Sequence, residues 1–295
     1  MRITVAGAGI IGLSCAYRLA GAGHEVTVVA AAGPGESTSA VAGGVLYPPV
    51  RRPDKRIARW TAETLAVLRS QEAPGVRFRR GRVLLASGEP EPQWLRAMED
   101  PVRAGDQLVF TTALVDTPVY LTWLLSRVEA LGVRFEHRSL TSLVDLDADV
   151  VVNAAGLGAG RLAGDGSMVP IGGQVVHLTD PGLREFVVDE TGPGVTYVIP
   201  HGDHVVCGGT EEPGRGDVEP NPGVTADIVR RSRELVPALA GAEILRSAVG
   251  LRPFRPVVRL ERKDDVVHCY GHGGAGITLA WGCAADVAEL VGSAP

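Results

Sequence analysis

Apolar and polar positions recur along the chain in patterns that predict short strands separated by amphipathic helices. Residues 2–6 and 25–29 each form a short apolar run, and residues 13–20 between them have helical spacing. Helical spacing returns over residues 51–74 and 118–131. Because strand and helix patterns are mixed within one chain, we expect an α/β fold.

The middle of the chain has a different period. Residues 170–210 alternate every second position, with many glycine and proline turns between the runs. This pattern predicts a second, mostly antiparallel sheet. The other predicted elements are a strand pair over 76–86, strands at 108–114, 133–135 and 150–152, a helix within 217–240 and a final helix over 277–291.

A glycine-rich turn joins the first strand to the first helix. It reads Gly7-Ala8-Gly9-Ile10-Ile11-Gly12, and strand, G-x-G-x-x-G and helix in this order are typical of a dinucleotide-binding unit. Gly7 allows the tight turn, Gly9 lets the backbone approach a pyrophosphate, and Gly12 packs the helix on the strand. An acidic residue usually follows the second strand to bind the adenosine ribose. Here Ala30-Ala31-Ala32 occupies that place and no carboxylate comes before Glu36, so ribose binding must use backbone, water or a later side chain.

The segment from residue 250 to residue 284 has the composition of a binding site. Arg252 stands between an apolar run and Pro253, so we expect its position to be fixed. A charged turn is expected at 261–265. The glycine loop Gly271–Gly276 follows a short apolar strand and precedes the last helix, so backbone N–H groups and a helix N-terminus can approach a ligand closely.

The order of these elements indicates an interleaved organisation. The nucleotide-binding pattern opens the chain, returns in its middle and closes it. We therefore expect a discontinuous Rossmann-like domain of residues 1–46, 132–168 and 247–295, interleaved with an α+β domain of residues 47–131 and 169–246 that is built on the mostly antiparallel sheet.

Composition narrows the class of partner. The chain has 295 residues, 45% hydrophobic and 21% charged, which is typical of a globular protein. Its net charge of −5, without a basic block, argues against nucleic acid or an anionic membrane as partner. No uninterrupted apolar run reaches the about 20 residues of a membrane span, and the first strand begins at once, so we expect a cytoplasmic protein. Its four cysteines lie far apart in sequence, which predicts small buried side chains, with neither a disulfide framework nor a metal site.

Several stretches resemble the D-amino-acid oxidase family of flavoproteins. The most specific is Val266–Gly276 with Gly282 and Ala284, which is similar to the family signature except that Cys269 stands where Asn, His or Ala is expected. The other similar stretches are Val41–Gly44, Tyr197–Pro200, Gly250–Pro256 and Arg259–Arg262. They occur in collinear order over nearly the whole chain.

The resemblance implies non-covalently bound FAD as the cofactor. The pyrophosphate would lie at the first glycine-rich turn, with a hydroxyl cluster beside it, and the flavin would lie along a second glycine loop and the last one. The expected FAD-contacting residues are Gly7, Gly9, Ile10, Ile11, Gly12, Ser37, Thr38, Ser39, Gly43, Gly44, Val45, Val144, Gly273, Gly274, Ala275, Gly276, Ile277 and Thr278.

The resemblance also implies a substrate site. Arg252 would pair bidentately with the substrate α-carboxylate, Tyr197 would donate its hydroxyl to the same group, and the Gly274 carbonyl would accept from the amine. Vertebrate members add a second tyrosine where this chain has Pro193. The carboxylate therefore has one donor fewer, or another residue such as Tyr47 replaces it.

The implied reaction is oxidative deamination of D-amino acids. Hydride passes from Cα to flavin N5 without a protein base, and the products are a 2-oxo acid, ammonia and H2O2. Relatives specific for D-aspartate carry an arginine where this chain has Glu211, so we expect neutral or basic side chains to be favoured over D-Asp. A D-amino acid and O2 are then the expected small-molecule partners, and the oligomeric state, with a homodimer among the options, stays open.

Three alternatives also stay open. A glycine or sarcosine oxidase shares the implied fold and cofactor. A flavin dehydrogenase of the same superfamily would pass its electrons to a quinone instead of O2. A non-catalytic protein that binds NAD or FAD as a sensor belongs to a different class.

Overall fold

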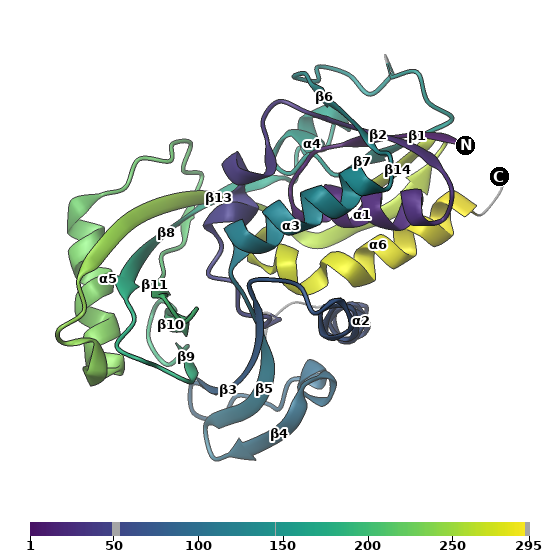
Figure 1. The fold of residues 1–295 in the computed structure, drawn as a ribbon. Coiled ribbons are helices and arrows are strands. Elements are labelled where there is room, and N and C mark those ends of the chain that lie inside the picture. The colour runs from purple at the N-terminus through teal and green to yellow at the C-terminus, as the bar shows by residue number, and fades with distance from the viewer. Residues whose placement is uncertain (49–53, 145, 293–295) are drawn as a thin grey trace.

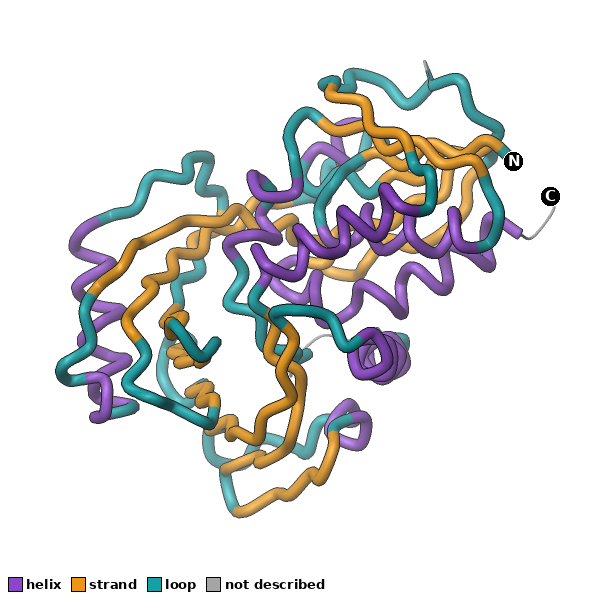
Figure 2. The backbone as a smooth tube through the Cα atoms, in the orientation of Figure 1, coloured by secondary structure: helices purple, strands orange, loops and turns teal. Residues whose placement is uncertain are grey.

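The computed structural model describes residues 1–48, 54–144 and 146–292. Among these, fourteen strands join in one continuous sheet (Figures 1 and 2). The strands are β1 (Arg2–Ala6), β2 (Glu25–Ala30), β3 (Val76–Leu84), β4 (Glu99–Ala104), β5 (Gln107–Val115), β6 (Arg134–His137), β7 (Val150–Asn153), β8 (Val169–Thr179), β9 (Phe186–Asp189), β10 (Thr196–Pro200), β11 (His204–Gly208), β12 (Glu212–Pro213), β13 (Ile244–Lys263) and β14 (Val266–His272).

The helices are unevenly distributed over the sheet. They are α1 (Ile10–Gly21), α2 (Ile57–Gln71), α3 (Thr117–Ala130), α4 (Gly158–Leu162), α5 (Pro222–Leu235) and α6 (Gly276–Gly292), with short 3-10 turns η1 (Pro34–Glu36), η2 (Thr38–Val41), η3 (Gln93–Ala97), η4 (Pro237–Leu239) and η5 (Gly273–Ala275). Figure 2 shows most helices gathered on one half of the molecule, while α5 lies alone at the far end.

One half of the sheet is parallel, in the order β14-β7-β1-β2-β6. Alternate residues of β1 are buried on opposite faces: Val5 packs in the core that includes α1 and α6, and Ala6 packs with Leu143 and Leu146 of the loop before β7. Both faces are therefore covered, as is usual for parallel strands. The order strand, helix, strand over residues 2–30 is the predicted dinucleotide-binding unit.

The other half is mostly antiparallel and is joined to the first by β13. The first part of β13 pairs with β8 and its end pairs with β14, so this one strand runs through both halves (Figure 1). Beyond β8 the order is β11-β10-β9-β3-β5-β4, in which only β9 and β3 are parallel. Helix α5 packs on β8, β10 and β11. The predicted α/β class and the mostly antiparallel strands are confirmed, but these strands continue the first sheet and do not form a second one.

Two local predictions were wrong. Residues 76–84 form one strand, β3, and not a strand pair. Gly81 resembles a turn in the sequence, but a Cβ there would lie 2.3 Å from Phe186 Cδ1, so the glycine allows Phe186 to pack across the strand. The turn expected at 261–265 is shorter: β13 continues to Lys263, and only Asp264, with φ of 55°, and Asp265 form the connection.

Other elements differ only in their limits. The helix predicted over 51–74 covers Ile57–Gln71, and residues 51–53 lie outside the described part of the chain. The helix predicted within 217–240 covers Pro222–Leu235. Strand β4 was not predicted from the sequence. Strand β13 was not predicted either, because it contains prolines; its pairing with β14 shifts register between Phe254 and Arg259, which accommodates Pro256.

The predicted domain boundaries stay a prediction. Helices α2 and α3, which the sequence placed in the second domain, pack against α6 and α1 of the nucleotide-binding pattern. A single buried cluster contains residues of both halves, for example Val5 and Phe110.

Helix α6 is the most apolar helix of the described chain. Together with η5 it forms a segment, Gly273–Gly292, that is long and apolar enough by composition to span a membrane. However, 61% of its apolar window is buried inside the fold, and α6 packs against α1, α2 and β14. These contacts are those of a core helix.

Candidate active site

A cavity of about 1800 Å³ lies where the two halves of the sheet meet. Its walls include the segments that follow the carboxyl ends of four parallel strands: the turn after β1, residues 31–33 after β2, residues 138–140 after β6 and residues 154–158 after β7. Ligands of open α/β sheets bind at this end of the strands. Tyr197 and Arg252 of the antiparallel half complete the lining.

The cavity brings together most of the predicted site residues. Those that line it are Gly7, Gly9, Ile10, Ile11, Ser37, Thr38, Ser39, Gly43, Gly44, Val45, Tyr197, Arg252, Gly273, Gly274, Ala275, Gly276 and Ile277. Gly12, Val144 and Thr278 are not in the lining.

Val144 was predicted to contact FAD, but it does not line the cavity. Its side chain is 92% exposed, and the cavity instead meets the same loop at Leu140. Beyond Leu140 the loop turns beneath the sheet, where Leu143 and Leu146 are buried against β1, β2 and β7. The sequence has several apolar residues in this loop, and their spacing does not distinguish the one at the cavity.

The first glycine-rich turn has the close approaches that the motif predicts. Gly7 has φ of +111°, and a Cβ there would lie 2.4 Å from the Ala154 carbonyl oxygen. A Cβ on Gly12 would lie 1.9 Å from the Gly7 carbonyl oxygen. Gly12 therefore lets α1 pack on the turn, and the N-terminus of α1 faces the cavity at Gly9 and Ile10.

The three hydroxyls of the cluster make different contacts. Ser39 Oγ accepts a hydrogen bond from the Ile10 N–H at 3.1 Å. Thr38 donates to the Leu251 carbonyl at 2.9 Å, and Ser37 donates to the Pro34 carbonyl at 2.6 Å. Ser39 is therefore the one held at the N-terminus of α1, while Thr38 fastens this segment to β13 beside Arg252.

The second glycine loop is held from the antiparallel half. Gly44 has φ of +81°, and a Cβ there would lie 1.9 Å from the Val115 carbonyl oxygen. His201 Nε2 lies 2.9 Å from the Gly43 carbonyl oxygen and donates to it. This loop is thus clamped between β5 and the turn after β10.

The last glycine loop forms η5 and opens α6. Gly273 has φ of +59°, and the N-terminal end of α6 faces the cavity at Gly276 and Ile277. Thr278 Oγ1 accepts from the Tyr47 N–H at 3.3 Å, so this side chain joins α6 to the chain after the second glycine loop. The partial positive charge of the helix terminus favours an anion here.

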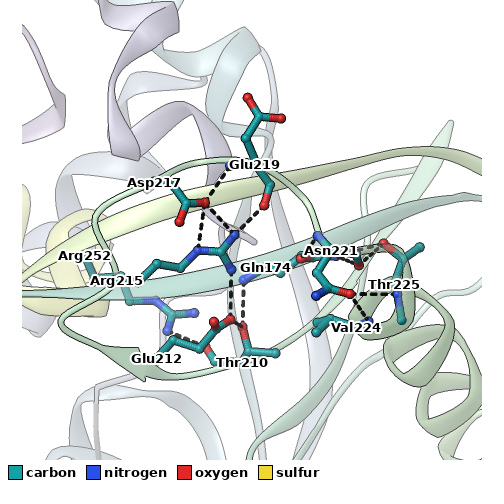
Figure 3. A network of polar contacts seen from close by, with 11 residues as sticks. Gln174, Thr210, Glu212, Arg215, Asp217, Glu219, Asn221, Val224, Thr225 and Arg252 are labelled. Atoms are coloured by element: carbon teal, nitrogen blue, oxygen red, sulfur yellow. Dashed lines mark hydrogen bonds and ion pairs between the residues drawn. The ribbon is translucent and has the colours of Figure 1, made fainter.

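Arg252 lies on β13, and glycines make the space for its side chain. A Cβ on Gly173 would lie 2.4 Å from Arg252 Cζ, and Gly274 is close to Arg252 Cδ on another side. Arg252 Nη1 donates to the Thr210 carbonyl oxygen at 2.8 Å (Figure 3). The guanidinium is therefore fixed, as its place before Pro253 predicted, and its partner is a neutral carbonyl.

Tyr197 is held in the same way. It pairs with Gly208 across β10 and β11, and a Cβ on Gly208 would lie 2.2 Å from Tyr197 Cζ. Burial raises the pKa of the Tyr197 hydroxyl, and the positive charge of Arg252 opposes this shift. Tyr197 is thus a protonated hydrogen-bond donor beside a guanidinium.

Tyr47, which the sequence suggested as a substitute for a second tyrosine at position 193, lines the cavity. Its hydroxyl donates to Glu190 Oε1 at 2.7 Å, and burial together with the Glu190 charge raises the pKa of Tyr47. Pro193 lines the cavity on an exposed loop. Glu190 was not among the site residues predicted from the sequence. A signal was present, because Glu190 continues the alternation of β9 two residues after Val188, which is paired with Tyr197.

Two arginines lie at the end of the cavity where the sequence lacks the usual acidic ligand of the ribose. Ala31 lines this end together with Glu36, Arg138 and Arg161. Arg161 Nη2 donates to the Leu140 carbonyl at 3.3 Å. The absence of a carboxylate directly after β2 is thus accompanied by positive charge from two other loops.

The cysteines are all buried, as predicted. In space they are less scattered than in sequence, because Cys269, His272 and Cys283 place possible metal-ligating atoms within 4.8 Å of one another. Cys269 and His272 also line the cavity.

The geometry fits an elongated dinucleotide. Two helix N-termini face one cavity, and at Gly7 and Gly44 a side chain would meet neighbouring backbone. A family model described as "FAD dependent oxidoreductase" matches residues 2–290.

The chain belongs to this FAD-dependent oxidoreductase family. It is 41% identical over 314 residues to a D-amino-acid oxidase of Rubrobacter xylanophilus, covering 99% of this chain and 96% of that one. It is 39% identical over 307 residues to a D-amino-acid oxidase of Streptomyces coelicolor, covering 98% and 96%. The resemblance predicted from the sequence is therefore confirmed, and FAD is the cofactor of this oxidoreductase.

A solved structure shows that the fold is shared. The glycine oxidase from Geobacillus kaustophilus superposes with a TM-score of 0.83 over 98% of this chain and 94% of that one, at 22% identity. The same fold thus occurs in an oxidase that is named for a different substrate, glycine.

Proposed function

We propose that this protein oxidises D-amino acids to imino acids, which hydrolyse to 2-oxo acids and ammonia, with H2O2 as the second product. The relatives named D-amino-acid oxidase support the substrate class, at 41% and 39% identity over nearly the full chain. The observation that carries the proposal is the pair of Arg252 and Tyr197 on the wall of the cavity that also contains Gly273 and Gly274.

Arg252 binds the substrate α-carboxylate. One guanidinium N–H is used by the Thr210 carbonyl, and the planar fork offers its other N–H groups to the carboxylate. Because Thr210 supplies a neutral oxygen, this contact leaves the positive charge of Arg252 available for the substrate. Tyr197 donates its hydroxyl to the same carboxylate.

The substrate amine lies at the Gly274 carbonyl, which accepts from it. When bound, FAD would supply the acceptor for the Cα hydride and the route of the electrons to O2. With the amine neutral and the Cα hydrogen leaving as hydride, no protein base has to remove a proton, so orientation by Arg252, Tyr197 and Gly274 would provide the catalysis. This assignment needs none of the histidines near the cavity.

Three segments hold the cofactor. The N-terminus of α1 and Ser39 bind the pyrophosphate, because N–H groups and the helix dipole favour an anion there. Gly43–Val45 would lie along the flavin. The residues Gly273–Ile277 would hold its pyrimidine edge, where the N-terminus of α6 would favour negative charge.

Side-chain selection comes from Glu211. This carboxylate lines the cavity next to Thr210, the residue that contacts Arg252. A negative charge there repels acidic substrates, so we infer that neutral or basic D-amino acids are favoured over D-Asp.

The setting of the enzyme is also a proposal. We infer that it works in the cytoplasm on soluble D-amino acids and O2, without a membrane or nucleic acid as partner. The net charge of −5 supports the last point. A monomer and a homodimer both fit, and size-exclusion chromatography with light scattering separates them.

A peroxide-coupled screen of D- and L-amino acids, glycine and sarcosine with added FAD tests the proposal. We expect D-Ala or D-Phe to be oxidised fastest, with one H2O2 formed for each substrate. Glycine or sarcosine as the best substrate would favour the glycine oxidase alternative, and turnover without peroxide would favour a quinone-linked dehydrogenase. A colourless protein that FAD cannot reconstitute would leave only the non-catalytic alternative.

A further inference from the structure

We propose that His201 is a positioning residue for the cofactor: its ring fixes the Gly43–Gly44 peptide so that the Gly44 N–H is offered to the flavin. The inference rests on the part of the proposed function that lays Gly43–Val45 along the flavin. His201 itself is 2% exposed and does not belong to the cavity lining.

Three consecutive carbonyl groups of the second glycine loop are each held by a different element. The Ala42 carbonyl accepts from Thr117 Oγ1 of α3 at 3.3 Å, and the Gly44 carbonyl accepts from a backbone N–H of β5 at 2.8 Å. The Gly43 carbonyl between them accepts from His201 Nε2 at 2.9 Å. Because a carbonyl oxygen can only accept, this contact requires a proton on Nε2 of the ring.

The Gly43–Gly44 peptide presents its two polar groups to opposite sides. It is a trans peptide, so its carbonyl and its N–H point in opposite directions. The carbonyl points at the buried His201 ring, while both glycines line the cavity. Among the described residues, no group accepts a hydrogen bond from the Gly44 N–H. This donor is therefore available to a ligand in the cavity.

Side chains on one face of β10 pack against the same two glycines. Tyr197 and Ile199 precede His201 at two-residue spacing, as expected for one face of a strand. A Cβ on Gly43 would lie 2.9 Å from Ile199 Cδ1 and 3.2 Å from Tyr197 Cε2. A Cβ on Gly44 would lie 3.4 Å from His201 Cε1. The glycine loop thus lies directly on these three side chains, and His201 adds the hydrogen bond that sets the direction of its peptide.

The ring of His201 is itself fixed. Its backbone N–H donates to the His204 carbonyl at 2.8 Å, and its backbone carbonyl accepts from Arg77 of β3. The His204 ring stacks on it with centroids 5.2 Å apart, and His177 stacks on His204 at 5.1 Å. Burial lowers the pKa of His201, and the hydrogen bond to Gly43 opposes this shift. A side chain held in this way can impose an orientation on the loop.

These contacts predict a loss of affinity that is confined to the flavin end of the cofactor. Without the Nε2–H donor, the Gly43 carbonyl loses its partner and the peptide can turn, so the Gly44 N–H is no longer directed into the cavity. The end of the cavity at Ala31 and Arg138 is built from other segments. A ligand that contains the flavin should therefore bind less tightly, and a ligand without it should not.

The test uses His201→Phe, which keeps a planar ring for the stack with His204 and removes the donor. The full chain, freed of FAD, is titrated with FAD by fluorescence and with ADP, which lacks the flavin, by calorimetry. We expect the Kd for FAD to rise about three- to tenfold and the Kd for ADP to stay within about twofold of the parent. His201→Gln, whose side-chain amide also donates, should recover most of the FAD affinity.

The matched control is His177→Phe, because His177 is a buried histidine at the far end of the stack, one ring removed from His201. It should keep the parent Kd for both ligands. An unchanged Kd for FAD in His201→Phe overturns the proposal. So does an equal rise for FAD and ADP, which a merely structural role would give, or a loss that His201→Gln does not reduce. If His201→Phe does not fold, His201→Leu replaces it and the same outcomes decide.

FAD binding does not require turnover, so failures can be told apart. If His201→Phe weakens the binding of FAD and not of ADP while the parent oxidises no D-amino acid, the role of His201 is supported and the proposed function is contradicted. If the parent oxidises D-amino acids and His201→Phe binds FAD as the parent does, only the role of His201 is contradicted.

Discussion

The hydroxyl of Ser39 accepts a hydrogen bond from the backbone N–H of Ile10 at 3.1 Å. Ser39 belongs to η2 and Ile10 opens α1, so a side chain from one segment is held at the helix N-terminus of another. Both segments face the cavity, where we propose that FAD binds.

Ser39→Ala should weaken FAD binding by about three- to tenfold, which is the usual effect of losing one hydrogen bond. Fluorescence titration of the apoprotein with FAD measures this change. Ser126→Ala is the control, because the Ser126 hydroxyl donates to the Trp123 carbonyl at an exposed position of α3, away from the cavity. An unchanged FAD affinity in Ser39→Ala would remove Ser39 from the cofactor site.

Gly208→Ala should displace Tyr197, which we propose binds the substrate carboxylate. The new Cβ would lie 2.2 Å from Tyr197 Cζ, so the ring has to move. We expect KM for D-Ala to rise at least about tenfold with little change in FAD affinity. Gly216→Ala is the matched control, since a Cβ there meets nothing within 4 Å. Equal kinetics for the two variants would show that the position of Tyr197 is unimportant.

Glu211→Arg should change the preferred side chain. It reverses the charge next to the Arg252 contact, so kcat/KM for D-Asp should rise relative to D-Ala, and that for D-Arg should fall. Steady-state kinetics on the three substrates gives the ratios. Glu211→Gln should lie between the two proteins. D-Asp as the best substrate of the parent protein would contradict the role given to Glu211.

Buried histidines should make the fold sensitive to acid. Burial lowers the pKa of His177 to about 3 and that of His268 to about 4. The unfolded chain protonates these groups near pH 6.5, and the folded chain does so only at lower pH. The free energy of unfolding is therefore largest above about pH 6.5 and decreases as the pH falls from there toward about 4.

Urea denaturation at a series of pH values measures this decrease. In His177→Gln the fall in stability below about pH 6.5 should be smaller than in the parent. His137→Gln, at an exposed position of β6, is the control and should follow the parent curve. A stability that is constant down to about pH 4 would show that these histidines are protonated in the folded state.

Periodicity and glycine spacing were sufficient to predict the glycine-rich segments that line the cavity. The turn at Gly7–Gly12 depends on residues near in sequence, and close backbone contact at Gly7 leaves only glycine as an option. Arg252 was recognisable as fixed because of its apolar and proline neighbours. Such features are local, and local patterns report them.

Features that depend on pairing between distant strands were not predictable. Thr210 holds Arg252 across 42 residues of chain, and this contact exists only because β8 lies between β12 and β13. The strand pair predicted over 76–86 is a single strand, because Gly81 makes room for Phe186 of another strand. Val144 was predicted at the cavity, where the structure has Leu140. The course of this loop depends on which of its apolar side chains are buried against the sheet.

The most direct test of the account is anaerobic reduction of the bound flavin. The FAD-loaded protein is mixed with D-Ala or L-Ala, and the absorbance near about 450 nm is followed. We predict that D-Ala bleaches the flavin, that L-Ala leaves it oxidised, and that Arg252→Met requires at least about a hundredfold more D-Ala for the same rate. Bleaching by L-Ala at the rate of D-Ala, or by D-Ala in Arg252→Met as in the parent, would contradict it.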